Sequence, residues 1–126
     1  VYKRQILCVG ESYSTYKTKK SIQFIKSQLQ VLTKKTIKNT IIAYEPIWSI
    51  GTGIIPSEQY LNKTFDHLTQ YCKKKYSLKP KILYGGSVNA NNIKVLKNIY
   101  NCSGFLIGGA SLKYKSFTNL IKNYYK

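Results

Sequence analysis

The sequence predicts an α/β fold built from four parallel strand–helix units. Short continuous apolar runs, typical of strands covered on both faces, alternate with segments whose apolar residues recur every three or four positions. Three of these runs end in glycine and one ends in a glutamate followed by proline, and such residues stop strands. The alternation favours parallel strands joined by right-handed crossovers. No linker or repeat interrupts the pattern, so we expect one domain unit over residues 1–126.

The first unit pairs a strand over residues 6–9 with a helix over residues 22–32. Gly10 and Glu11 end the strand, and Cys8 within it is interpreted as a small core residue. A polar loop is expected next. The apolar stripe of the helix consists of Ile22, Ile25, Leu29 and Leu32.

The second unit begins with a strand over residues 40–44 that carries Glu45 at its carboxyl end. Ser57 is expected to cap the following helix, with Glu58 in its first turn. The buried stripe of this helix is Leu61, Phe65, Leu68 and Cys72. Lysines close the helix, and Pro80 prevents its continuation.

The last two units repeat this plan. Strands are predicted over residues 81–84 and 104–107, and Asn89 is expected to cap a short helix between them. The apolar face of that short helix is Ile93, Leu96 and Ile99. The stripe of the last helix is Phe117, Leu120, Ile121 and Tyr124.

The net charge of +17 does not by itself predict a nucleic-acid partner. Of the 21 basic residues only Arg4 is an arginine, the residue best suited to bidentate phosphate and base recognition. The lysines are scattered over all the predicted helices rather than gathered on one. We therefore expect a solvated lysine surface, which attracts anionic substrates, and no specific nucleic-acid site.

Cysteine spacing and hydropathy exclude several other classes of protein. Cys8, Cys72 and Cys102 are far apart and form no C-x-x-C pair, so neither a disulfide framework nor a zinc site is expected, and a reducing cytoplasm fits best. No apolar run approaches the ~18 residues of a membrane span, so no membrane partner is expected. His67 lies in a predicted helix away from any strand end and is interpreted as a surface residue.

The main functional signal is the stretch Ala43-Tyr44-Glu45-Pro46-Ile47-Trp48-Ser49-Ile50-Gly51-Thr52-Gly53. It places one carboxylate, Glu45, at the mouth of the sheet. Pro46 fixes its own φ, whereas Gly51 and Gly53 leave theirs free, so the segment between them can move as a lid. Two further motifs end predicted strands, Tyr84-Gly85-Gly86-Ser87-Val88-Asn89 and Gly104-Phe105-Leu106-Ile107-Gly108-Gly109-Ala110-Ser111-Leu112.

In this order and spacing, the three motifs resemble those of the triosephosphate isomerase family. The resemblance covers essentially all 126 residues and aligns them with units five to eight of a TIM (β/α)8 barrel, its C-terminal half. A complete barrel typically needs ~250 residues. The sequence starts at Val1 and contains no methionine. We therefore expect this partial TIM-barrel domain to be preceded, in a longer protein, by an N-terminal half.

The resemblance also implies roles for individual residues. Glu45 matches the general base that moves a proton between two carbons of a triose phosphate through an enediolate, with no metal and no cofactor. The positions matching phosphate contacts are Gly51, Ser87, Gly108 and Gly109. The positions matching the lid and its latch are Pro46, Trp48, Gly53, Tyr84 and Glu11. In particular, Ser87 is expected to meet the N–H of Gly53, and Trp48 to pack near Glu11.

This sequence departs from the family pattern at three places. Pro56 falls where the family often has an alanine whose N–H meets the latch tyrosine, and proline has no N–H, so we expect closure to depend on Ser87 rather than on Tyr84. Thr69 and Ser103 replace an arginine and an aspartate that usually form a salt bridge, and losing both avoids a lone buried charge.

The resemblance implies a triose-phosphate isomerase of glycolysis and gluconeogenesis, cytoplasmic, and a homodimer when full length. The electrophilic lysine and histidine of the family have no counterpart in these 126 residues, so the chain alone is expected to be inactive. Two alternatives remain open at this point. One is another phosphate-binding barrel enzyme, although Glu45-Pro46-Ile47-Trp48 is not expected there. The other is a non-catalytic basic half-barrel that binds polyanions.

Overall fold

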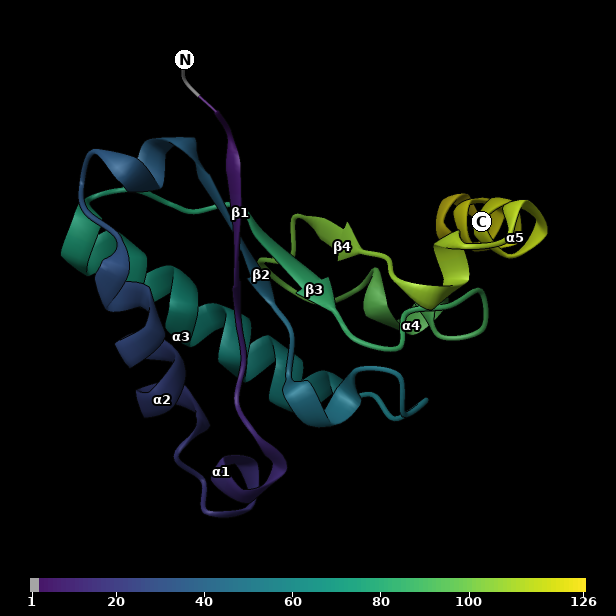
Figure 1. Cartoon of the computed structure of the whole chain (residues 1–126), viewed down its shortest axis with the longest axis horizontal. Helices are drawn as coiled ribbons and strands as arrows, with labels where there is room; N and C mark the ends of the chain where they lie inside the picture. The colour runs from purple at the N-terminus through teal and green to yellow at the C-terminus, as the bar shows by residue number, and fades with distance from the viewer. Residues whose placement is uncertain (1–2) are drawn as a thin grey trace.

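The computed structural model describes residues 3–126 and contains one sheet of four parallel strands in the order β1-β2-β3-β4 (Figure 1). The strands are β1 (Gln5–Val9), β2 (Thr40–Tyr44), β3 (Ile82–Gly85) and β4 (Gly104–Leu106). Cys8 pairs with Ala43 and Tyr44 with Tyr84, so the carboxyl ends of β1, β2 and β3 lie together. The predicted α/β class with four parallel units is confirmed. The strand over residues 40–44 has the predicted bounds, and the other three differ by one residue at one or both ends.

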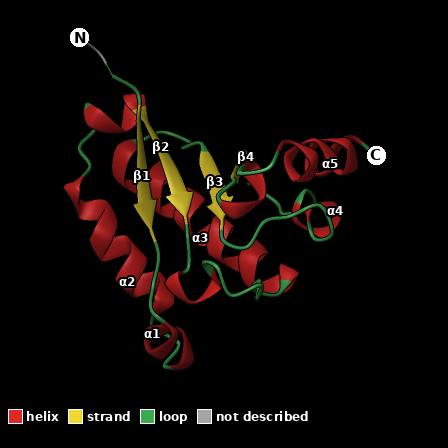
Figure 2. Cartoon of the chain, turned by 45° about the vertical axis from the view of Figure 1, so that its right-hand side comes forward, coloured by secondary structure: helices red, strands yellow, loops and turns green. Residues whose placement is uncertain are grey.

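Five α-helices accompany the sheet within the described residues. They are α1 (Tyr13–Lys17), α2 (Ser21–Gln28), α3 (Glu58–Tyr76), α4 (Ile93–Leu96) and α5 (Tyr114–Tyr125). Figure 2 shows α3 passing behind the strands. Short 3-10 turns lie at η1 (Leu29–Val31), η2 (Thr36–Asn39), η3 (Ile47–Ser49) and η4 (Gly109–Ser111). The last two follow the carboxyl ends of β2 and β4.

The hydrophobic core lies between the sheet and α2, α3 and α4. The four predicted stripe residues of α3 are fully buried, and Ser57 caps this helix by accepting the Tyr60 N–H at 3.2 Å, as expected. The short-helix face of Ile93, Leu96 and Ile99 is also buried. Its cap differs from the expectation, because the cap residue of α4 is Asn92. Asn89 instead holds the preceding turn, where its side-chain oxygen accepts the N–H groups of Asn91 and Asn92.

The predicted burial of the first strand is wrong on one face. Val9 packs in the core, but Ile6 is 49% exposed and Cys8 is exposed, so Cys8 is not a core residue. The reason is that β1 is an edge strand, and the face carrying Ile6 and Cys8 is not covered by the described residues. Successive side chains of a strand point to opposite faces, so Val9 is buried and Leu7 partly buried, whereas the alternate residues Ile6 and Cys8 are exposed.

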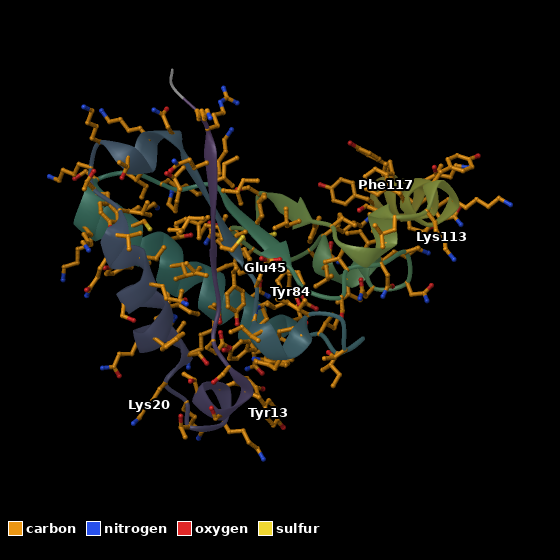
Figure 3. All side chains as sticks on the ribbon, in the orientation of Figure 1. Tyr13, Lys20, Glu45, Tyr84, Lys113 and Phe117 are labelled. Atoms are coloured by element: carbon orange, nitrogen blue, oxygen red, sulfur yellow. The ribbon has the colours of Figure 1, made fainter. Side chains whose placement is uncertain are left out.

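Two helical segments also differ from expectation. The predicted polar loop contains α1, whose N-cap Ser12 accepts the Thr15 N–H at 3.3 Å. The last helix forms as α5, but of its predicted stripe only Leu120 is buried. Figure 3 shows Phe117 on α5 at the periphery, and this ring is 38% exposed. The apolar pattern therefore predicted the helix correctly but not how much of its stripe is covered.

Candidate active site

Glu45 lies directly after β2 and is held by the strands on both sides. Its N–H donates to the Val9 carbonyl at 2.8 Å, which extends the pairing of β1 and β2 by one residue. On the other side, a Cβ at Gly85 would lie 2.5 Å from Glu45 Oε1. A Cβ at Gly10 would overlap the Glu45 carbonyl. The two glycines therefore make room for Glu45, whose half-buried side chain lies near the middle of the molecule (Figure 3).

The thiol of Cys8 is a neighbour of this carboxylate. Cys8 is exposed overall, but partial desolvation of its thiol, followed by the neighbouring Glu45 carboxylate, raises the pKa of this thiol. A raised pKa means that the protonated thiol is favoured. Next to Glu45 the Cys8 thiol is therefore neutral and does not add a second anion.

The 46–53 segment, Pro46 to Gly53, follows Glu45 and is tied to the loop after β3. Ser87 Oγ donates to the Ser49 carbonyl at 2.6 Å and accepts the Gly53 N–H at 2.9 Å. The hydrogen bond expected between Ser87 and Gly53 is thus present. Gly51 and Gly53 have φ of 70° and 78°, the left-handed region that favours glycine.

The Tyr84 hydroxyl has a hydrogen-bond partner other than residue 56, where proline replaces the alanine often found in the family. It lies 3.1 Å from Ser49 Oγ, and both side chains are fully buried. Burial raises the pKa of Tyr84 to about 12. Elsewhere in the 46–53 segment, Trp48 Nε1 donates to Glu11 Oε1 at 3.2 Å. The indole therefore lies against Glu11, as expected.

A cavity of about 580 Å³ lies at the carboxyl ends of β2, β3 and β4. Six of the sequence-predicted residues line it, namely the catalytic candidate Glu45, the phosphate candidates Gly51, Ser87, Gly108 and Gly109, and the latch residue Gly53. The other predicted residues, Pro46, Trp48, Tyr84 and Glu11, do not line it. The cavity thus brings one carboxylate together with glycine-rich turns, whose backbone N–H groups are suited to an anionic group.

Four polar residues that line this cavity were not predicted as site residues, namely Asn89, Asn91, Ser116 and Asn119. Asn89 and Asn91 belong to an asparagine-rich run that follows Gly85-Gly86 of the second motif, and that run was a usable signal. Ser116 and Asn119 lie on α5 within no motif, so no signal in the sequence marked them. Within residues 3–126, no group of three or more His, Cys, Asp and Glu is placed to hold a metal ion.

Comparison with known proteins places this geometry in a family. The family model described as triosephosphate isomerase matches residues 3–124. The chain belongs to the triosephosphate isomerase family. Another class of phosphate-binding barrel enzyme is thereby set aside. None of the described helices is both long and apolar enough to cross a membrane.

Curated triosephosphate isomerases from several bacteria are similar to the chain. It is 43% identical over 117 residues to that of Ureaplasma parvum, covering 92% of this chain and 49% of the relative. Identity to the Campylobacter jejuni subsp. doylei protein is 42% over 117 residues, covering 93% and 49%. Identity to the Borreliella burgdorferi protein is 38% over 130 residues, covering 97% and 51%. The chain thus spans about half the length of these relatives, and its four parallel strands correspond to half of a TIM barrel.

Proposed function

We propose that this chain is the part of a triose-phosphate isomerase that supplies the general base and most of the phosphate site. The observation that carries the proposal is the shared cavity of Glu45 with Gly51, Ser87, Gly108 and Gly109. A triose phosphate whose phosphate group lies at the glycine turns presents its carbon atoms towards Glu45. The substrates are dihydroxyacetone phosphate and glyceraldehyde 3-phosphate.

In this proposal Glu45 takes a proton from the carbon next to the carbonyl and returns it to the neighbouring carbon. The intermediate is an enediolate, and no metal or cofactor takes part. A carboxylate is a stronger base when water is excluded around it, so closure of a lid assists the transfer. The 46–53 segment is the proposed lid. Its tie to Ser87, through the Gly53 N–H and the Ser49 carbonyl, is the proposed latch.

The charge that develops on the substrate oxygens needs electrophilic groups that the motifs of this chain do not provide. In the proposal these groups come from the other half of the barrel, so the chain by itself is inactive. The complete isomerase is a cytoplasmic homodimer of glycolysis and gluconeogenesis. Inorganic phosphate or a triose phosphate is the ligand expected at the glycine turns, rather than a nucleic acid.

The test is a chimera in which residues 3–124 replace the matched half of the Ureaplasma parvum relative. We expect the chimera to interconvert the two triose phosphates, and Glu45→Gln to lower kcat by about 10²–10⁴-fold, the usual contribution of a general base. Glu58→Gln is the matched control, because Glu58 is an exposed carboxylate at the start of α3. An active chimera that keeps its kcat in the Glu45→Gln variant would overturn the proposed role of Glu45.

A further inference from the structure

Glu11 is a buried carboxylate that receives hydrogen bonds from three different elements. It is 0% exposed. The Tyr44 hydroxyl on β2 lies 3.1 and 3.2 Å from its two oxygens, and the Tyr60 hydroxyl on α3 donates to Oε1 at 3.0 Å. Trp48 Nε1, in the 46–53 segment, donates to the same oxygen at 3.2 Å. All three donors are uncharged, and a buried carboxylate needs such donors to offset the loss of its hydration.

The indole of Trp48 is also enclosed by tyrosine rings. The Tyr16 ring of α1 lies 4.5 Å from it, centroid to centroid, and the Tyr13 ring lies at 6.2 Å in an edge orientation. Tyr16 in turn meets Tyr60 edge-on at 5.1 Å. These separations are within the range in which aromatic pairs stabilise each other beyond the area they bury. Trp48 is thus fixed both by its N–H and by its ring.

The contact of the Trp48 indole with Glu11 is the one that the resemblance to the family implies. We propose that Tyr60 and Tyr16 complete this contact as a clamp, the Glu11 clamp, which holds Trp48, and with it the 46–53 segment, in the conformation described here. Within this Glu11 clamp, Tyr60 and Tyr16 are positioning residues: neither lines the cavity of Glu45, and both act through Trp48. The consequence for catalysis rests on the proposed function, because it requires that the 46–53 segment be the lid of an isomerase. The clamp itself does not depend on that activity.

Tyr60 is suited to this role because its own position is set by the start of α3. Ser57 caps the helix by accepting the Tyr60 N–H at 3.2 Å, which fixes the backbone from which the hydroxyl reaches Glu11. Tyr44 extends from the sheet to the same carboxylate. Two donors on two rigid elements orient the Glu11 carboxylate, and its oxygen is then placed where Trp48 Nε1 meets it.

Both hydroxyls remain donors over a wide pH range. Burial, followed by the charge of Glu11, raises the pKa of Tyr44, and burial is also the largest cause of the raised pKa of Tyr60. The clamp therefore requires no charged partner for Glu11. It also supplies the 46–53 segment with a second anchor, at Trp48, in addition to the hydrogen bonds of Ser87.

Trp48 is the only tryptophan of the sequence, so its indole N–H gives a single signal whose hydrogen exchange can be followed by NMR in the 126-residue chain. Tyr60→Phe keeps the ring and removes the donor. Because a hydrogen bond to a charged group is lost, we expect indole exchange to become about tenfold faster. Tyr16→Leu removes the ring next to the indole and should accelerate exchange by a similar factor. Acrylamide quenching of Trp48 fluorescence should increase in both variants.

Tyr71→Phe is the matched control, since Tyr71 is also on α3 and its hydroxyl only accepts from Lys75 Nζ. Its indole exchange should equal that of the parent chain. Far-UV circular dichroism checks that each variant is folded. If Tyr16→Leu does not fold, the nearly isosteric Tyr60→Phe alone tests the proposal. Unchanged exchange and quenching in a folded Tyr60→Phe would overturn the proposal. Neither measurement needs substrate, so an inactive chimera would refute the proposed function without affecting this result.

Discussion

Tyr84 is connected to the end of the 46–53 segment through the side chain of Ser49. Ser49 Oγ donates its hydrogen to the Ile54 carbonyl, so at the 3.1 Å contact between the two hydroxyls Tyr84 is the donor. The tyrosine on β3 thus reaches the backbone beyond the proposed lid by a relay. Pro56, which has no N–H, is not needed as its partner. Proline at position 56 removes a backbone N–H donor, but the Tyr84 hydroxyl still has a buried hydrogen-bond partner, Ser49.

This relay should be measurable as a coupling energy. We expect Tyr84→Phe and Ser49→Ala to destabilise the chain individually, and the double variant to cost less than their sum. The difference should be about 0.5–1.5 kcal/mol, the net value of one buried hydrogen bond. Urea denaturation of the four proteins gives the cycle. Strict additivity would show that the two hydroxyls do not form this bond in solution.

Alkaline pH should destabilise the protein through its buried phenols and thiol. Burial raises the pKa of Tyr84 to about 12 and that of Cys72 to about 11, from 10.0 and 9.0. For such groups the stabilisation is complete below the ordinary pKa and is lost as pH rises through the raised one. The free energy of unfolding should therefore decline from about pH 9 towards about pH 12.

Substitution identifies the contribution of Tyr84 to this decline. Tyr84→Phe has no phenol to titrate, so its loss of stability between about pH 10 and about pH 12 should be shallower. The control is Tyr100→Phe, whose ring is 72% exposed. Denaturant midpoints measured across this range are the readout. An equal slope in Tyr84→Phe and in the parent chain would contradict the assignment.

The elements predicted most accurately from the sequence are those whose ends are marked by nearby residues. The strand over residues 40–44 was placed with the correct bounds, and the helix after Ser57 with the correct start. In both cases one apolar pattern ends at an unambiguous signal, Glu45-Pro46 in one and a serine cap in the other. The positions of Cys8 and Phe117 were less predictable. An apolar pattern shows which face of an element can be buried, but not which neighbour covers it.

In the site, too, features set by neighbouring residues were predicted and features set by packing between distant segments were not. Residues within contiguous motifs, such as Glu45 and Gly108, were assigned to one site by the resemblance. They line one cavity because the carboxyl ends of parallel strands lie at one edge of a sheet. The partners of Glu11 were not all found. Tyr44 and Tyr60 lie 33 and 49 residues from it in the chain, and no spacing rule connects an α3 tyrosine to a loop after β1. Only the packing of α3 beneath the sheet brings them together.

Gly85 should prove essential because its missing side chain leaves room for the proposed base. A Cβ there would lie 2.5 Å from Glu45 Oε1 and 2.7 Å from its Cγ, so Gly85→Ala must displace the carboxylate. In the chimera we expect kcat to fall about 10²-fold, the cost of a misplacement of about 1 Å. Gly108→Ala is the contrast, since its Cβ would meet nothing within 4 Å in this structure and should mainly raise KM. Steady-state kinetics separate the two effects, and an unchanged kcat in Gly85→Ala would show that Glu45 does not act from this position.

The edges of the sheet should make the 126-residue chain associate with itself. β1 and β4 are its outer strands, and Ile6 on β1 is 49% exposed, while Ile121 on α5 is 41% exposed. Unpaired strand edges next to apolar surface favour pairing between chains. We expect sedimentation velocity to show oligomers, and Ile6→Lys and Ile121→Lys to shift the distribution towards monomer. Val31→Lys adds the same charge at a 70% exposed residue outside the strands and should change the distribution less. A parent chain that sediments as a monomer and melts cooperatively would show that these edges are already protected in solution.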